Sequence, residues 1–275
     1  MALRINYNLA SSSAQRGLGA SQDAYAKQAN RLSTGLRINS ASDDTAGMAV
    51  SEKLKNQVRG LNQAQRNAQD GISLIQTAEG ALTETHSILA RMRELAVQGA
   101  NDTLNNSDRA NLEAEFTQLK AEVTRIAGAT QFNGIVLLNG ANSSLTLQIG
   151  ANNGNTLAVT LTNNDAAALA IDTAARASVT SLAVAATTIT QLDAAINTVS
   201  TNRANLGAVQ SRLESASRSI AVAAENTAAA NSRVADADIA SSMSELVRAQ
   251  ILQQAGISVL AQANQAPSLV LQLLK

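Results

Sequence analysis

Few side chains in this 275-residue chain could support catalysis or bind a metal, and they lie far apart in the sequence. His86, in TETHSILA, is the only histidine, and the chain has no cysteine. A zinc site needs several histidine, cysteine or carboxylate ligands at set spacings, and the pattern HExxH is absent. We therefore expect no metal site, and we interpret His86 as a solvent-facing residue or a residue at the edge of a packing seam.

Asp43 and Asp44 are adjacent carboxylates in the segment SASDD. Such a pair could contribute to a cation site, but acidic residues at the start of a helix also cap it and complement its dipole. We favour the capping role, because polar turn residues here precede a long helical pattern. The sequence also contains no Walker loop, GxGxxG or GxSxG motif. We therefore predict that the chain is not an enzyme and uses no cofactor.

The charge and composition of the chain argue against a nucleic-acid partner. Lys and Arg number 21, Asp and Glu also number 21, and aromatic residues make up 1% of the chain. The basic side chains therefore lack the interleaved aromatic residues that nucleic-acid-binding surfaces use. Alanine, leucine and uncharged polar residues are abundant and there is a single proline, which favours long helices.

The C-terminal tail has no charged residue from Ala249 to Leu274. Its glutamine amides would each need a hydrogen-bonding partner in lipid, and Pro267 is expected to break the tail, so we predict no membrane insertion. At the other end, MALRINYNLASSSAQRG has no continuous apolar run, so we expect no cleavable signal. The glutamines are Gln250, Gln253, Gln254, Gln262, Gln265 and Gln272.

A seven-residue repeat predicts the helices that carry these residues. Two stretches place apolar or small side chains at every seventh position, a spacing typical of coiled-coil packing. A sparser repeat predicts a helix in the first 35 residues that ends near Gly35, and a further amphipathic helix is predicted over 112–126. The repeat positions are Leu18, Tyr25 and Leu32; then Leu54, Leu61, Ala68, Ile75, Leu82, Leu89 and Ala96; then Leu192, Val199, Leu206, Leu213, Ile220, Thr227 and Val234.

The middle of the chain has a different pattern, with no charged residue from Ile126 to Asn164. Runs of β-forming residues between Asn/Gly turns predict short strands near 135–138, 145–149 and 156–161, with a hairpin turn at ANNGN. The stretch 165–185 shows no clear pattern. We therefore predict a mainly α fold: a long antiparallel, coiled-coil-like helical rod with a small β-hairpin region at the centre of the sequence.

Four long segments resemble bacterial flagellin and occur in the order typical of that family. They are RLSTGLRINSASDDTAGMAVSEKL, RMRELAVQGAND, QFNGIVLLNG and ILQQAGISVLAQANQAP. The resemblance covers residues 1–140 and 190–275. It implies a structural subunit of the flagellar filament, used in motility, in which the terminal helices form an inner-core domain and the long helices form a rod.

The resemblance also implies a division of the chain into five parts. Residues 1–43 are the N-terminal inner-core segment and linker, and residues 44–140 are the N-terminal part of the rod. Residues 141–189 are a short β-hairpin and variable region, which implies little or no outer domain. Residues 190–235 complete the rod, and residues 236–275 are the C-terminal inner-core segment.

The uncharged tail is suited to self-assembly. The chain carries 14 large apolar side chains after Asp238, and their burial is comparable in free energy to the cost of ordering the backbone. We therefore expect the terminal segments to order only when neighbouring copies cover them in a helical homopolymer. The candidate inter-subunit residues are Leu18, Tyr25, Leu32, Ile239, Met243, Leu246, Ile257 and Leu260.

Further partners and a location follow from the resemblance alone. It implies export through the flagellar type III apparatus with an export chaperone, contact with the filament cap and hook-associated proteins, and a secreted, extracellular place in the bacterial flagellum. It also implies that the monomer is a ligand of Toll-like receptor 5 of vertebrate hosts, with Arg91, Leu95 and Glu115 at the matching positions.

The repeat predicts where these three residues lie. Arg91 should lie off the packing seam, and Leu95, next to a seam position, should lie at its edge and be partly exposed. Glu115, on the neighbouring helix, could complete one surface with Arg91. Ala90 stands where many family members carry glutamine.

Other structural classes explain the sequence less well. A hook–filament junction protein has similar ends, but it should match RMRELAVQ and the C-terminal tail only weakly. A coiled-coil signalling protein or adhesin stalk would need a sensor or ligand domain. A flagellin that carries an inserted metalloprotease would need a larger centre containing HExxH.

Overall fold

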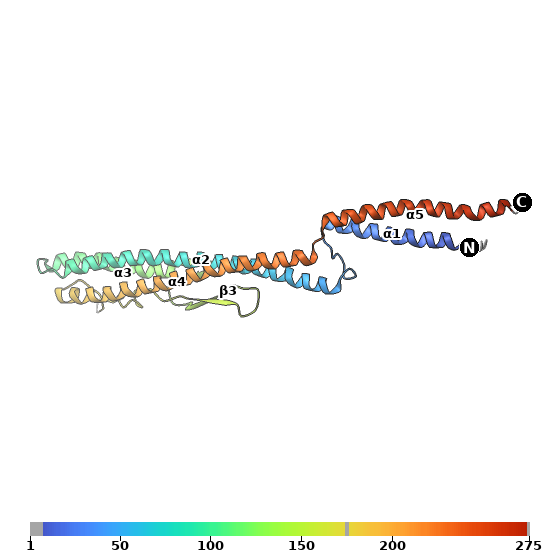
Figure 1. Ribbon diagram of the computed structural model, residues 1–275. Helices are drawn as coiled ribbons and strands as arrows, with labels where there is room; N and C mark the ends of the chain where they lie inside the picture. The colour runs from blue at the N-terminus through green and yellow to red at the C-terminus, as the bar shows by residue number, and fades with distance from the viewer. Residues whose placement is uncertain (1–7, 174–175, 274–275) are drawn as a thin grey trace. The chain divides into compact units, whose positions relative to one another are not determined.

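The computed structural model describes residues 8–173 and 176–273, so residues 1–7 of the predicted N-terminal helix lie outside the described part. Within it, the chain contains five helices and two small antiparallel sheets (Figure 1), which confirms the mainly α prediction. The elements are α1 (Leu9–Thr34), α2 (Thr45–Gly99), α3 (Asn106–Ala129), β1 (Gln131–Phe132), β2 (Ile135–Val136), β3 (Ser144–Gln148), β4 (Thr156–Thr160), α4 (Leu182–Ala235) and α5 (Ile239–Leu273).

The chain divides into two compact units. The middle unit is Gln57–Glu225, and the terminal unit combines the described residues of Met1–Asn56 and Asn226–Lys275. The boundaries fall inside α2 and α4, so each of these long helices contributes to both units. The five-part division of the sequence stays a prediction.

Capping residues set both ends of α1 and the start of α2. Asn8 caps the first turn of α1, and α1 ends at Gly35, which has φ 71° and donates its N–H to the carbonyl of Arg31 at 2.8 Å. Glycine adopts this left-handed conformation without a steric penalty. Asp44 precedes α2, and its Oδ1 accepts the N–H of Gly47 at 2.8 Å. The predicted end at Gly35 and the predicted cap at Asp44 are therefore confirmed.

In the middle unit, α2 and α4 pack antiparallel, with α3 alongside (Figure 1). Two ion pairs show that the helices run in opposite directions, because Glu79 pairs with Arg203 at 3.8 Å and the later residue Arg93 pairs with the earlier residue Asp193 at 2.6 Å. The predicted repeat positions in this unit are all buried, as the coiled-coil interpretation requires. They are Leu61, Ala68, Ile75, Leu82, Leu89 and Ala96 on α2, and Leu192, Val199, Leu206, Leu213 and Ile220 on α4.

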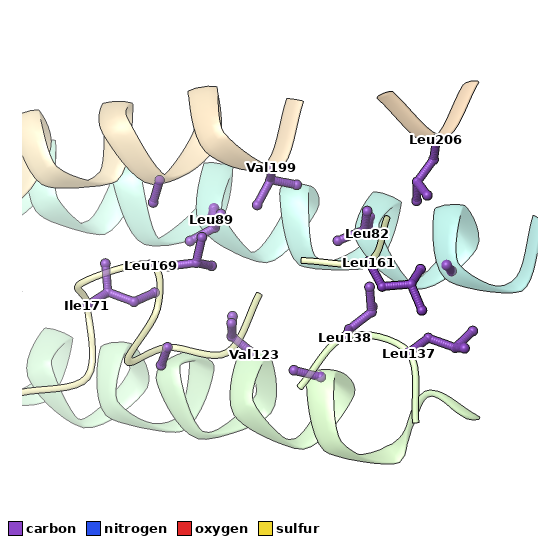
Figure 2. Packing of buried hydrophobic residues seen from close by; sticks show 14 of the residues in the cluster. Leu82, Leu89, Val123, Leu137, Leu138, Leu161, Leu169, Ile171, Val199 and Leu206 are labelled. Atoms are coloured by element: carbon purple, nitrogen blue, oxygen red, sulfur yellow. The ribbon is translucent and has the colours of Figure 1, made fainter. Parts of the chain in front are cut away.

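An irregular segment completes the core of the middle unit. The described residues of 165–181 form neither helix nor strand, yet Ile171 (Figure 2) and Val179 are fully buried within the core cluster. Glu113 of α3 holds this segment, because its Oε2 accepts the N–H of Val179 at 2.7 Å. Side-chain hydrogen bonds of this kind leave no periodic pattern in the sequence.

The predicted β-hairpin is present. β3 and β4 pair antiparallel over their full lengths, and ANNGN lies in the loop between them, as predicted. The predicted strand 135–138 is shorter, because Leu137 and Leu138 leave β2 and enter the core, where each is 1% exposed. β2 pairs with β1, a strand of two residues that was not predicted.

In the terminal unit, α1 and α5 lie side by side and antiparallel (Figure 1). Near one end of the pair, Nδ2 of Asn8 donates to the carbonyl of Ala263 at 2.8 Å, and beyond the other end Leu36 and Asp236 form an antiparallel β-bridge. α5 continues through Pro267 to Leu273, so the expected break at that proline is wrong. The missing N–H removes one hydrogen bond from a helix of 35 residues.

Candidate functional site

Most of the exposed large apolar side chains lie on α1 and α5. No residue of α1 is buried, and on α5 only Ser242 and Ala249 are buried among the side chains that the structure describes. Among the side chains that the structure describes, nine of the thirteen exposed large apolar ones belong to these two helices, and we call them the α1–α5 surface. Apolar side chains left exposed together on one pair of packed helices are typical of an interaction surface. The nine are Leu9, Tyr25, Ile239, Met243, Val247, Ile251, Leu252, Ile257 and Val259.

The eight predicted assembly residues fall into two groups. Leu18, Leu32, Leu246 and Leu260 are half-buried, and Leu18 lies against Gly256 of α5. The exposed group is Tyr25, Ile239, Met243 and Ile257.

Sequence analysis missed Val247, Ile251, Leu252 and Val259, which are also exposed on α5. The predicted stripe follows one face of α5, whereas the apolar residues of α5 occur on more than one face. For Ile251, Leu252 and Val259, the signal available in the sequence was the absence of charge after Arg248, because a helix that is apolar on all sides is normally covered on all sides.

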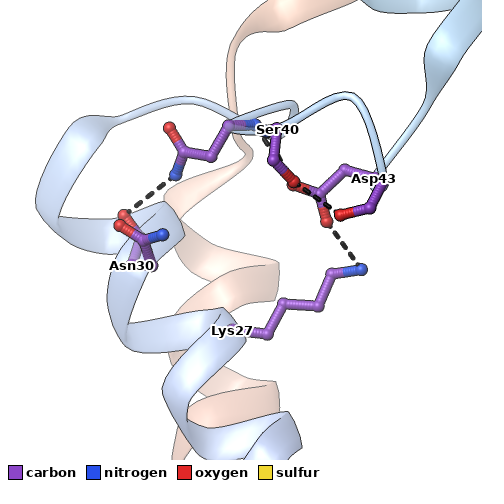
Figure 3. A network of polar contacts seen from close by, with 6 residues as sticks. Lys27, Asn30, Ser40 and Asp43 are labelled. Carbon is purple, nitrogen blue, oxygen red and sulfur yellow. Dashed lines mark hydrogen bonds and ion pairs between the residues drawn. The ribbon is translucent and has the colours of Figure 1, made fainter.

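A polar network fixes the loop between α1 and α2 (Figure 3). Oδ2 of Asp43 accepts the N–H groups of Asn39 and Ser40, each at 3.2 Å, and Nζ of Lys27 lies 2.8 Å from Oδ1. The Lys27 ammonium, followed by these two N–H groups, holds the pKa of Asp43 well below its usual range. Asp43 therefore organises the loop, so the capping role predicted for both carboxylates is wrong for Asp43 and confirmed for Asp44.

The two linkers of the terminal unit are tied to each other. The N–H of Arg37 donates to the carbonyl of Ala235 at 2.7 Å, and the N–H of Ala237 donates to the carbonyl of Gly35 at 2.9 Å. These backbone bonds connect the segment that follows α1 with the segment that precedes α5. The pair α1 and α5 is thus joined at its linkers as well as along its length.

Arg91 and Glu115 form an exposed ion pair between α2 and α3. Nε of Arg91 lies 3.0 Å from Oε1 of Glu115, and Nη1 lies 2.9 Å from Oε2 of Glu94. Glu115, and then Glu94, raise the pKa of Arg91. The Arg91 side chain is 51% exposed, so it lies off the packing seam and beside Glu115, as expected.

Leu95 is fully buried, so the expected position at an exposed edge is wrong. α2 contributes to a core shared with both α3 and α4, so its buried face is wider than one seam. Met92 and Leu95 are buried there in addition to the seam residues Leu89 and Ala96.

The part of the chain that the structure describes forms no metal-binding cluster around His86. His86 is half-buried on α2. Across residues 8–173 and 176–273, no group of three or more histidine, cysteine or acidic side chains is arranged to hold a metal ion. None of the described helices combines the length and apolar character needed to cross a membrane.

Comparison with known proteins relates both ends of the chain to one family. Residues 5–143 match the bacterial flagellin N-terminal helical region, and residues 189–274 match the bacterial flagellin C-terminal helical region. The chain is 49% identical over 271 residues to a flagellin of Halalkalibacterium halodurans, covering 98% of this chain and 99% of that one. It is 44% identical over 304 residues to a flagellin of Bacillus subtilis, covering 99% and 100% of the two chains.

Two further comparisons agree. The chain is 43% identical over 284 residues to a flagellar filament 31.3 kDa core protein of Treponema maltophilum, covering 98% of this chain and 99% of that one. The crystal structure of Bacillus cereus flagellin aligns with a TM-score of 0.52 and 36% identity, covering 60% of this chain and 94% of that chain. Because the similarity to flagellins extends over nearly its whole length, the chain belongs to the bacterial flagellin family.

Proposed function

We propose that this chain, a structural subunit of the bacterial flagellar filament, joins neighbouring copies of itself through the α1–α5 surface. The observation that carries the proposal is the exposure of nine large apolar side chains on those two helices. Burial of one such side chain contributes about 1.5–3 kcal/mol. Neighbouring copies that cover this surface would therefore supply a driving force for polymerisation.

The charge distribution of α5 supports the same proposal. Arg248 is the last charged residue before Lys275. A charge buried between subunits would lose its solvation at a large free-energy cost unless it were paired. A helix whose last turns carry only apolar and neutral side chains avoids that cost when several copies surround it.

A pair of matched substitutions tests the proposal. Ile251 on α5 is 60% exposed, and Val222 on α4 is 58% exposed. Seeded polymerisation, followed by sedimentation, should show that Ile251→Asp raises the critical concentration at least tenfold, while Val222→Asp changes it little. Circular dichroism should show folded monomers for both variants. Normal assembly of Ile251→Asp would contradict the proposal.

Before assembly, we propose, the same surface engages the export machinery. An exposed apolar face on α5 offers a binding site to an export chaperone, and passage through the type III apparatus would place the chain outside the cell. Contacts with the filament cap and the hook-associated proteins would follow there. Pull-down with the cognate chaperone should succeed with the full chain and fail with a chain that lacks 239–275. Equal binding of the two chains would count against this role for α5.

A second candidate function is recognition of the monomer by Toll-like receptor 5. The exposed guanidinium of Arg91, held beside Glu115, is the observation that favours it. An arginine in this position can make a bidentate contact with an acidic group of a partner. Of the three residues implied by the family resemblance, Arg91 and Glu115 would make the contact, and Leu95 would support it from the core.

A further inference from the structure

An asparagine that precedes a glycine can lose its side-chain amide without an enzyme. The backbone nitrogen of the glycine attacks Cγ of the asparagine, ammonia leaves, and water opens the resulting five-membered imide to an aspartyl or an isoaspartyl residue. Glycine favours this reaction because it has no Cβ to obstruct the approach of its nitrogen. The chain contains three such pairs, all in its uncharged middle: Asn133-Gly134, Asn139-Gly140 and Asn153-Gly154.

Asn153 and Gly154 are exposed at the tip of the loop between β3 and β4. They are the central residues of a turn that one hydrogen bond closes, from the N–H of Asn155 to the carbonyl of Asn152 at 3.3 Å, which is longer than a typical bond of this kind. Among the described residues, none is hydrogen-bonded to the side chain of Asn153 or to the N–H of Gly154. Both reacting groups can therefore move towards each other without breaking a bond of their own.

The second pair is held in place on both sides. Asn139 is half-buried, and its Oδ1 accepts the N–H of Ala141 at 3.0 Å. Gly140 lies close to Asn163, because a Cβ added to the glycine would lie 2.9 Å from Cβ of Asn163. The hydrogen bond must break and this packed backbone must open before the ring can close. Local opening costs free energy, so Asn139 should react more slowly than Asn153.

The third pair is exposed but forms a tight turn. Asn133 has φ 49° and Gly134 has φ 79°, as in a two-residue hairpin connection, here between β1 and β2. Phe132 and Ile135 pair across the turn, and both pack against the core of the middle unit. Ring closure needs rotation about the backbone of Asn133, which the anchored strands oppose. Asn133 should therefore also react more slowly than Asn153.

We propose that Asn153 is a site of spontaneous deamidation in the folded chain and the fastest of the three. The reaction consumes water and releases ammonia, and it needs no oxidant, metal or cofactor. Its product places a carboxylate in a stretch that has no charged residue from Ile126 to Asn164. The isoaspartyl form also adds a methylene to the main chain, two residues from Ala151, which lies against Gly60 of α2. The modification therefore changes both the charge and the backbone of the hairpin tip.

A comparison of folded and unfolded chain tests the proposal. The full chain is incubated in mildly alkaline buffer, with and without urea, and peptide fragmentation in the mass spectrometer measures aspartyl and isoaspartyl product at each asparagine. In the folded chain, Asn153 should react at least about fivefold faster than Asn133 and Asn139, whereas in urea the three rates should agree within about twofold. Equal rates in the folded chain, or a faster reaction at either other site, would overturn the proposal.

Two neighbouring substitutions confirm the assignment. Asn153→Gln lengthens the side chain, so the five-membered ring cannot form, and product should disappear at this position while the rates at Asn133 and Asn139 stay unchanged. Asn152→Gln is the control, because the structure uses only the backbone carbonyl of Asn152 and its side chain is exposed. Persistence of the product in the hairpin loop of Asn153→Gln, or its loss in Asn152→Gln, would contradict the assignment. A product that contains aspartyl without isoaspartyl would contradict the imide route.

Discussion

The Nε atom of Arg91 on α2 lies 3.0 Å from Oε1 of Glu115 on α3, and both side chains stay exposed. Exposed ion pairs contribute little to folding stability, so these groups can serve recognition without weakening the fold when they are changed. Four residues after Arg91, Leu95 is fully buried. The segment RMRELAVQ therefore combines a surface residue and a core residue, whose substitutions should have separable effects.

Replacement of the surface residue should affect recognition. We expect Arg91→Ala to lower activation of Toll-like receptor 5 about tenfold or more, the effect of losing an interface arginine. A cell reporter assay with folded monomer measures it, and intact filament should activate poorly. Arg125→Ala is a matched control, because Arg125 is also exposed and paired, to Glu122 at 2.6 Å. Unchanged potency of Arg91→Ala would refute the receptor role and leave the filament role intact.

Replacement of the core residue should affect stability. Leu95→Ala removes a fully buried side chain and leaves a cavity, so the free energy of unfolding should fall by about 2–5 kcal/mol. Val97→Ala, at a position 50% exposed on the same helix, should change it little. Denaturant unfolding followed by circular dichroism compares the two. A loss below about 1 kcal/mol for Leu95→Ala would be inconsistent with its buried position.

The network at Asp43 should be sensitive to acid. Because the pKa of Asp43 is lowered in the folded chain, its stabilising effect is fully present above the unfolded value near pH 4 and declines as the pH falls towards the folded value. Asp43→Asn should therefore speed hydrogen exchange in residues 36–44 at neutral pH. The difference in thermal stability between Asp43→Asn and the unmodified chain should shrink below about pH 4.

Asp23→Asn is the control for that experiment, since it removes an exposed carboxylate of α1 outside this network. A difference for Asp43→Asn that stays constant from neutral pH to well below pH 4 would show that the charge of Asp43 is not what stabilises the loop.

The terminal helices should exchange quickly in the monomer. α1 has no buried residue, and on α5 the described side chains are mostly exposed, so local opening should cost little free energy. We expect backbone amides of α1 and α5 to exchange much faster than those of α2 in the middle unit. Polymerisation should then slow exchange in both helices. Protection of α5 in the monomer equal to that of α2 would contradict this expectation.

The seven-residue repeat predicted the helices whose buried side chains recur at that spacing. Leu82 and Leu213 lie in seven-residue repeats, and both are fully buried at the seam between α2 and α4. The repeat did not predict the burial of Leu95, because that burial depends on α2 packing against two helices at once. α4 begins at Leu182, ten residues before the first repeat position at Leu192. This first stretch of α4 packs against an irregular segment and not against a helix with a seven-residue repeat.

Other features depend on how the elements pack. The hollow around Ala24 arises only where α1 and α5 meet. The position of Glu115 beside Arg91 was predicted, because two amphipathic stripes place both residues just outside the core. Which subunit surfaces meet in the filament depends on contacts between copies and not on the packing within one chain.

A reconstruction of the assembled filament at side-chain resolution tests that question most directly. We predict that Ile251, Leu252, Ile257 and Val259, all exposed in the single chain, are buried against α1 and α5 of neighbouring copies. A filament in which these side chains face solvent, with subunits joined only through residues of the middle unit, would contradict it.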